Sequence, residues 1–234
     1  RFEPYFTEKI YEESNGKVKQ IVLLLIEKIC AIHNGSVMNH NSIILEKTPS
    51  HALQVKDILK LLPNSKFIHV VRNPLDVISS IQNSFTRSPS ILARVRLWEN
   101  IVLQVQKVKR NIPDKILEIT YEDIIKNPSN SNQLICSWLG IKANDDFYQL
   151  FASKYASVSQ KHEHWKTSKI STSIEVRENK WNDELSKEQA WLSYVFLKRH
   201  FIRYKFQAPP SVKVSDKVLV MLKEFRLLIS SKIR

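Results

Sequence analysis

Glycine is scarce in this chain, and its scarcity excludes several ways of binding a phosphate group. Only three glycines, Gly16, Gly35 and Gly140, occur in 234 residues, and all three are isolated. The loops G-x-G-x-x-G and G-x-x-x-x-G-K-[ST] and the nucleophile elbow G-x-S-x-G need closely spaced glycines, because side chains would block their sharp turns and close approaches. A phosphate bound by these residues must therefore be held by side chains, helix N-termini or ordinary backbone.

The charge balance predicts anionic partners. The chain has 36 Lys and Arg against 23 Asp and Glu, which gives a formal net charge of +13. Such an excess favours phosphate, sulfate, a polyanion or acidic lipid as a partner. Two cysteines are too few for a disulfide scaffold or a Cys-rich zinc module. The motif His162-Glu163-His164 offers two metal ligands, but further ligands are not apparent, so we expect no metal.

Hydrophobic periodicity alternates between helical and strand patterns. It predicts helices over 17–32, 51–62, 90–110, 132–139 and 186–201, another helix beginning at Pro74, and strands over 43–45, 67–71 and 116–119. This order indicates an α/β domain with a mainly parallel sheet. The run Phe67–Val71 is continuously apolar or β-prone, which predicts a strand covered on both faces.

The segment that follows this strand carries the most informative polar residues. Arg72 comes directly after the strand, Asn73 can cap the next helix, and Pro74 suits its first position. Ser80 follows two turns into that helix. An arginine, a serine and a helix N-terminus at the carboxyl end of a strand can form a phosphate site. The alternative is structural: Arg72 caps a neighbouring helix or pairs with Asp76, and the geometry leaves both open.

Four segments resemble motifs of the sulfotransferases that use 3′-phosphoadenosine 5′-phosphosulfate (PAPS). Arg72-Asn73-Pro74 with Ser80 resembles the family's 3′-phosphate-binding segment. Glu46-Lys47-Thr48-Pro49, Tyr121-Glu122-Asp123 with the helix ending at Gly140, and Lys180-Trp181 are similar to three further family motifs, in family order. The resemblance covers about residues 1–205 and is greater to the carbohydrate and tyrosylprotein branch than to the small-phenol branch.

The resemblance implies a fold and a set of site residues. The fold would be a P-loop-NTPase-like parallel sheet flanked by helices. Arg72 and Ser80 would bind the 3′-phosphate of PAPS, or of its product PAP, and Lys47 would stabilise the leaving oxygen. Lys180 and Trp181 belong to the nucleotide-covering motif, and Trp181 or another aromatic residue would cover the adenine. Tyr121 is either part of the donor site or a core residue, and no metal is required.

One expected part of the family pattern does not occur in these residues. The family begins with a strand and a loop that cradles the 5′-phosphosulfate, and both would precede Arg1. The chain is therefore expected to be either an N-terminally truncated sulfotransferase without its first strand or a degenerate relative. Residues 1–205 are predicted to form the sulfotransferase-like domain and 206–234 an extension. Glu3 matches the position of the family's general base, or is a frayed surface carboxylate.

The C-terminal segment and the biological setting leave alternatives open. Residues 215–234 are predicted to form a basic amphipathic helix that docks on its own core or contacts an acidic membrane or a partner. The expected acceptor is a hydroxyl of a glycan, with anionic glycans included, of a tyrosyl peptide or of a metabolite. A degenerate sulfotransferase-like scaffold and a basic module for polyanions or nucleic acid are the alternatives, although no nucleic-acid motif is recognisable. A bacterial cytoplasmic location is favoured, with the Golgi lumen as the alternative.

Overall fold

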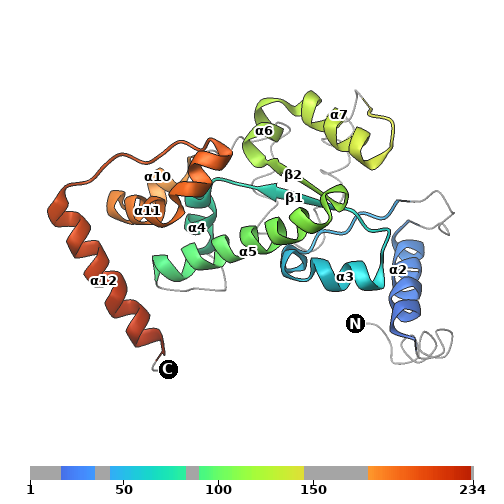
Figure 1. Cartoon of the computed structure of the whole chain (residues 1–234), viewed down its shortest axis with the longest axis horizontal. Helices are drawn as coiled ribbons and strands as arrows, with labels where there is room; N and C mark the ends of the chain where they lie inside the picture. Colours follow the sequence, from blue (N-terminus) through green and yellow to red (C-terminus); the bar gives the residue numbers. More distant parts are fainter. Residues whose placement is uncertain (1–16, 35–42, 83–89, 145–178, 233–234) are drawn as a thin grey trace. The chain divides into compact units, whose positions relative to one another are not determined.

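The computed structural model describes residues 17–34, 43–82, 90–144 and 179–232 of the chain (Figure 1). The chain divides into two compact units, Arg1–Ser65 and Lys66–Arg234. Each unit is described by itself. The prediction of one domain over residues 1–205 with an extension over 206–234 stays a prediction.

The described residues of the first unit form helices joined by segments without regular structure. Its elements are α2 (Val18–Asn34), the 3₁₀ helix η1 (Pro49–Leu53) and α3 (Val55–Leu61). The helix predicted over 17–32 is confirmed. The one predicted over 51–62 is interrupted, because a Pro-initiated 3₁₀ turn precedes α3. The strand predicted over 43–45 is wrong: these residues are not in a strand and their apolar side chains are exposed. A strand needs a pairing partner, and no described residue pairs with this segment.

The second unit contains a two-stranded sheet and most of the helices. Its elements are β1 (Phe67–Val71), α4 (Pro74–Gln82), α5 (Ile91–Asn111), the 3₁₀ helix η2 (Pro113–Lys115), β2 (Ile116–Thr120), α6 (Tyr121–Lys126), α7 (Pro128–Leu139), α10 (Trp181–Glu184), α11 (Lys187–Tyr204) and α12 (Val214–Lys232). The strands β1 and β2 are parallel, with Phe67 opposite Ile116 and Val71 opposite Thr120. The predicted parallel α/β class is confirmed. The coverage expected on both faces of β1 is incomplete, since Val70 is 48% exposed.

Local sequence signals explain several of these boundaries. Ser186 and Gln189 form a reciprocal capping box at the start of α11. Helix α7 ends at Gly140, which adopts the left-handed φ of 79° that a residue with a side chain rarely takes. Thr120 caps the short helix α6 by accepting a hydrogen bond from the backbone N–H of Asp123. Periodicity alone does not reveal α6, because it has only six residues.

The core of the second unit lies between β1 and the helices α4, α5, α10, α11 and α12. Its buried apolar residues are Val71, Leu75, Ile78, Ile91, Leu92, Val95, Trp98, Val102, Trp181, Leu185, Ala190, Leu192, Leu197, Phe201 and Val220. The buried Arg94 lies in α5 and donates hydrogen bonds to the carbonyls of Ile78 and Ser90. Burial lowers the pKa of Arg94, and the carboxylate of Glu224 in α12 opposes that shift.

The described residues show neither a membrane-spanning helix nor a cluster of metal ligands. No helix in the described ranges is both long enough and apolar enough to cross a bilayer. Within the same ranges, no three His, Cys, Asp or Glu side chains gather as metal ligands would. The motif His162-Glu163-His164 lies outside the described residues.

The buried histidine of α11 makes the stability of the second unit depend on pH. Burial is the main cause that lowers the pKa of His200 below its usual 6.5. The positive charge of Arg199 lowers this pKa further, while Glu99 opposes the shift. The unfolded chain therefore binds this proton at a higher pH than the folded chain does. As pH falls below about 6.5, the free energy of unfolding should fall because of this group, and the loss levels off below the folded pKa.

The substitution His200→Gln removes the titrating group, so we expect a shallower loss of stability on acidification. Between pH 6.5 and the folded pKa, the slope should decrease by up to about 1.4 kcal/mol per pH unit. Urea denaturation at a series of pH values, followed by circular dichroism, measures both slopes. Parallel pH profiles for the two proteins would contradict the role assigned to His200, whatever the variant's stability at neutral pH.

Candidate anion-binding site at the strand ends

The carboxyl ends of β1 and β2 bring two sequence motifs side by side. Val71 and Thr120 are paired in the last register position of the sheet, so Arg72 and Tyr121 both follow at the same edge. The guanidinium carbon of Arg72 lies 4.6 Å from the centre of the Tyr121 ring. A guanidinium over an aromatic face is attracted by the ring's quadrupole. Tyr121 therefore holds the arginine side chain, which is 26% exposed, at the strand ends.

The start of α4 is tied to the same edge by Asn73. Its side-chain Oδ1 accepts a hydrogen bond of 3.0 Å from the backbone N–H of Leu75, so Asn73 caps α4 as the sequence predicts. Its backbone N–H donates to Oε1 of Glu122 at 2.9 Å. Burial raises the pKa of Glu122, although the hydrogen bond from Asn73 opposes the shift. The second carboxyl oxygen of Glu122 is buried and has no hydrogen-bond partner in the structure.

Asp76 joins a third segment to this site. Its buried carboxylate lies 3.4 Å from the Arg72 guanidinium, one helical turn earlier. It also accepts hydrogen bonds of 3.2 Å from the backbone N–H groups of Asn179 and Trp181. These bonds join residues more than 100 positions apart in the chain and place the Lys180-Trp181 motif beside α4. Trp181 is itself buried, and its indole N–H has no partner there, whereas Lys180 is exposed.

The position of Ser80 follows from the helix that Arg72 precedes. Ser80 lies four residues after Asp76 in α4, so both are on the same side of the helix. Its side chain is exposed, in contrast to the buried Ser79, whose hydroxyl donates to the Asp76 carbonyl.

The structural alternative expected for Arg72, pairing with Asp76, is seen in the structure. This pairing leaves the Arg72 side chain partly exposed, at 26%.

The other two predicted residues are not among the described residues of the second unit. Lys47 lies in the first unit, in an exposed segment without regular structure before η1. Its neighbour Glu46 orders that segment: the carboxylate accepts a hydrogen bond from the Thr48 hydroxyl and lies 2.7 Å from Nδ1 of His51. Glu3 lies outside the described residues. The roles predicted for all seven site residues stay predictions.

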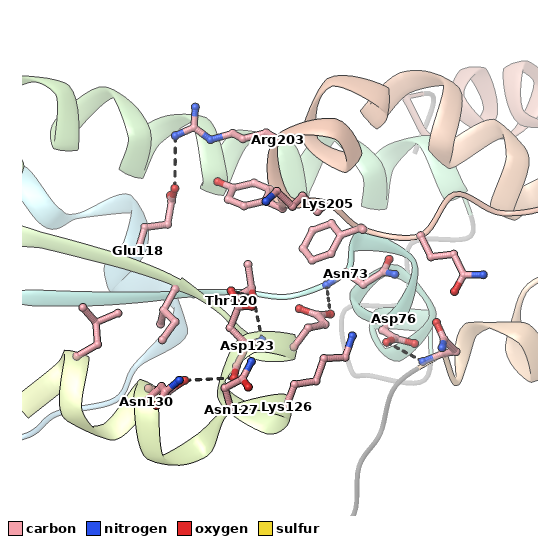
Figure 2. A pocket seen from close by; sticks show the side chains of 18 residues that line it. Asn73, Asp76, Glu118, Thr120, Asp123, Lys126, Asn127, Asn130, Arg203 and Lys205 are labelled. Carbon is pink, nitrogen blue, oxygen red and sulfur yellow. Dashed lines mark hydrogen bonds and ion pairs between the residues drawn. The ribbon is translucent and has the colours of Figure 1, made fainter.

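A cavity of about 900 Å³ lies beside the strand ends (Figure 2). None of the five predicted site residues described in the second unit lines it, although Asn73, Asp76, Glu122 and Asn179 do. Four carboxylates, those of Asp76, Glu118, Glu122 and Asp123, face three cations, those of Lys126, Arg203 and Lys205. This balance makes the cavity unfavourable for a doubly charged phosphate.

The carboxylate of Glu118 is paired with two side chains, those of His69 and Arg203. It lies opposite His69 on the adjacent strand, 3.2 Å from its Nδ1, and 3.5 Å from the Arg203 guanidinium (Figure 2). Burial alone would raise the pKa of Glu118, but the hydrogen bond and charge of His69, together with the charge of Lys109 and a hydrogen bond with Tyr204, outweigh burial and lower it. Nearby, burial raises the pKa of Tyr204 to about 12. The far wall of the cavity is therefore a charged network that is already satisfied within the chain.

Sequence reasoning did not identify the residues that assemble the site. The sequence indicates Asp76 only as an alternative partner of Arg72, and Glu122 only as part of a motif. The spacing of four residues between Arg72 and Asp76 was the available signal for their pairing. Nothing local indicates that Asp76 binds residues 179–181 or that Glu122 binds Asn73, because those contacts depend on how distant segments pack.

The fold and the geometry of the candidate site are compatible with one class of protein. A parallel α/β unit that presents an arginine and a helix N-terminus at its strand ends has the groups that can hold an anion there. The sequence profile of the sulfotransferase family matches residues 13–146, and the chain belongs to that family. Lys47, Arg72, Ser80 and Tyr121 lie within the matched range, whereas Glu3, Lys180 and Trp181 lie outside it.

Curated relatives agree with the family. The omega-hydroxy-beta-dihydromenaquinone-9 sulfotransferases Stf3 of Mycobacterium bovis and of Mycobacterium tuberculosis are each 24% identical to this chain over 147 residues. The match covers 57% of this chain and 37% of each relative, so the chain matches little more than a third of their length. No solved structure matches the chain significantly.

Proposed function

We propose that the chain transfers a sulfuryl group from PAPS to the hydroxyl of an acceptor. The observation that carries this proposal is the placement of Arg72 over Tyr121 beside the N-terminus of α4, in a chain of the sulfotransferase family. Arg72 and Ser80 bind the 3′-phosphate of the donor. The cationic side chain and the exposed hydroxyl fit a phosphate, which accepts hydrogen bonds from both.

The residues of this chain have separate roles in the proposed reaction. PAPS supplies the sulfuryl group, which passes to the acceptor oxygen as its bond to the 5′-phosphate breaks. Arg72 and Ser80 position the donor through a group remote from the reacting sulfur. Lys47 stabilises the negative charge that develops on the departing phosphate oxygen. Glu3 takes the proton from the acceptor hydroxyl. The roles of Lys47 and Glu3 rest on their motifs alone.

We infer that the acceptor presents a hydroxyl, as the substrate named for the mycobacterial relatives does. A glycan, a tyrosyl peptide and a small metabolite also carry this group. The basic composition of the chain favours an acceptor with negative charge near the hydroxyl. An acidic glycan and a neutral lipid alcohol are therefore the two acceptor types to compare first in a transfer assay.

Calorimetric titration with PAP tests the donor site directly. PAP and adenosine 5′-phosphate differ by the 3′-phosphate, so the ratio of their affinities isolates the contribution of that group. We expect PAP to bind at least ten times more tightly than adenosine 5′-phosphate. Equal affinities on a folded chain would argue against a 3′-phosphate site.

The binding of polyanions provides the control for this titration. A basic surface without a specific site would bind heparin or single-stranded nucleic acid with a steep dependence on salt. It would show no preference for PAP over adenosine 5′-phosphate. Competition by PAP against such polymers, measured at two salt concentrations, therefore separates a donor site from general attraction to negative charge.

A further inference from the structure

The last helix docks on the second unit through a polar side chain. Oε2 of Glu224 in α12 accepts hydrogen bonds from the Ser90 hydroxyl at 2.8 Å and from the Ile91 backbone N–H at 2.9 Å. These donors stand at the N-terminus of α5, where a negative charge is favoured. Glu224 is 2% exposed, and Val220, one turn earlier, is also buried. Of the alternatives expected for this helix, docking on its own core is therefore seen for this side of α12.

A third contact extends the docked side toward the start of the helix. The ammonium of Lys217 lies 5.0 Å from the centre of the Trp191 ring in α11. Lys217, Val220 and Glu224 are spaced by three and four residues, which places them on one stripe of the helix. This stripe faces α5 and α11, which both contact α12.

The opposite side of α12 carries large apolar side chains that are exposed in the structure. Val218, Met221, Leu222 and Phe225 form this apolar face, and all four are exposed, Leu222 and Phe225 by about 60%. Residues two positions apart lie about 200° apart around a helix, so Val218 is opposite Val220 and Leu222 is opposite Glu224. The helix therefore buries its glutamate and exposes its leucine and phenylalanine, the reverse of what a docked terminal helix would do to cover its own apolar surface.

The charges around the apolar face indicate which partner fits it. The exposed basic residues Lys223 and Arg226 lie on α12 outside the docked stripe. The acidic residues of the helix are Asp216 and Glu224, and the second is buried against α5. An apolar face accompanied by lysine and arginine is the pattern of a helix that lies in the headgroup layer of an acidic membrane. A second copy of the chain fits poorly, because each copy carries a formal charge of +13.

We propose that α12 binds the surface of an anionic lipid bilayer through Val218, Met221, Leu222 and Phe225, while Glu224 keeps the helix attached to the second unit. Lys223 and Arg226 contact the acidic headgroups. The docked stripe holds the helix at a fixed angle, so that the whole unit is carried to the membrane rather than the helix alone. This proposal is independent of the sulfotransferase reaction.

Vesicle co-flotation of the full chain tests the proposal. The probe vesicles are phosphatidylcholine alone and phosphatidylcholine with phosphatidylglycerol. We expect binding to the acidic vesicles only. The double substitution Leu222→Glu and Phe225→Glu should weaken that binding at least tenfold. The matched control is Phe196→Glu with Ile202→Glu, which alters two exposed apolar residues of α11 and changes the net charge equally. The control should bind nearly as wild type does.

A second pair of substitutions tests the charges. Replacing Lys223 and Arg226 with glutamine should weaken binding about fivefold for each charge removed. Equal losses in the α11 control and in the α12 variant would overturn the proposal, because general attraction by the basic chain would then explain the binding. Wild-type dimers that the α12 variant abolishes in sedimentation, without vesicle binding, would also overturn it and assign the face to a second copy.

Discussion

Replacing Arg72 with alanine should weaken the binding of PAP by about 10-fold to 100-fold and leave the affinity for adenosine 5′-phosphate nearly unchanged. A hydrogen bond to a charged group contributes about 1.5–3 kcal/mol, which corresponds to this range. The structure places the guanidinium over Tyr121 and beside the N-terminus of α4. Only the 3′-phosphate distinguishes the two nucleotides, so a selective loss assigns Arg72 to that group. Calorimetric titration of both nucleotides measures the difference.

Two further variants separate recognition from folding. Arg72→Lys keeps the charge near Asp76 but loses the planar fork, so it should retain part of the preference for PAP. Arg96→Ala removes one positive charge from an exposed position of α5 and should leave both affinities unchanged. If Arg72→Ala lowers the two affinities equally while circular dichroism remains native, Arg72 does not bind the 3′-phosphate.

Replacing Asp76 with alanine should lower the free energy of unfolding of the second unit by about 3–5 kcal/mol. The carboxylate is 2% exposed, pairs with Arg72, and accepts the backbone N–H groups of Asn179 and Trp181. Its removal leaves the two N–H groups without their acceptor. Asp76→Asn keeps the shape and one acceptor oxygen, so its loss should be smaller. Urea denaturation followed by circular dichroism measures both variants.

Hydrogen exchange locates the effect of the Asp76 substitution. The amides of Asn179 and Trp181 should lose protection in Asp76→Ala before the rest of the core does, because their acceptor is gone. An exposed carboxylate provides the comparison: Asp57→Ala in α3 should change stability by less than about 0.5 kcal/mol. A stability of Asp76→Ala within that same small range would show that the contact does not hold residues 179–181 to α4.

The sequence predicts the elements whose signals are local. The strand after Lys66, the cap at Asn73, the capping box at Ser186 and the helix end at Gly140 all depend on a few adjacent residues. Propensity, capping and periodicity act over that distance, so these features can be predicted without the fold. The order of the motifs also indicated the sulfotransferase family before any arrangement in space was known.

Features that depend on a distant partner in the chain cannot be predicted from local sequence signals. The run Ile43–Leu45 is apolar enough for a strand, but it forms none, because strand formation requires another strand in register. The amphipathic pattern of the last helix was predicted, but its orientation was not. Burial of Glu224 depends on the donors at Ser90 and Ile91, more than 130 residues away in the chain.

The amino-acid sequence by itself determined the α/β order, the positions of the two parallel strands and the motifs of the family. The tertiary structure decided which residues meet. It placed Arg72 over Tyr121, joined Asp76 to residues 179–181 and turned the apolar face of α12 outward. The physical reason is that helix and strand signals act between neighbours, whereas a buried charge finds its partner only when distant segments pack together.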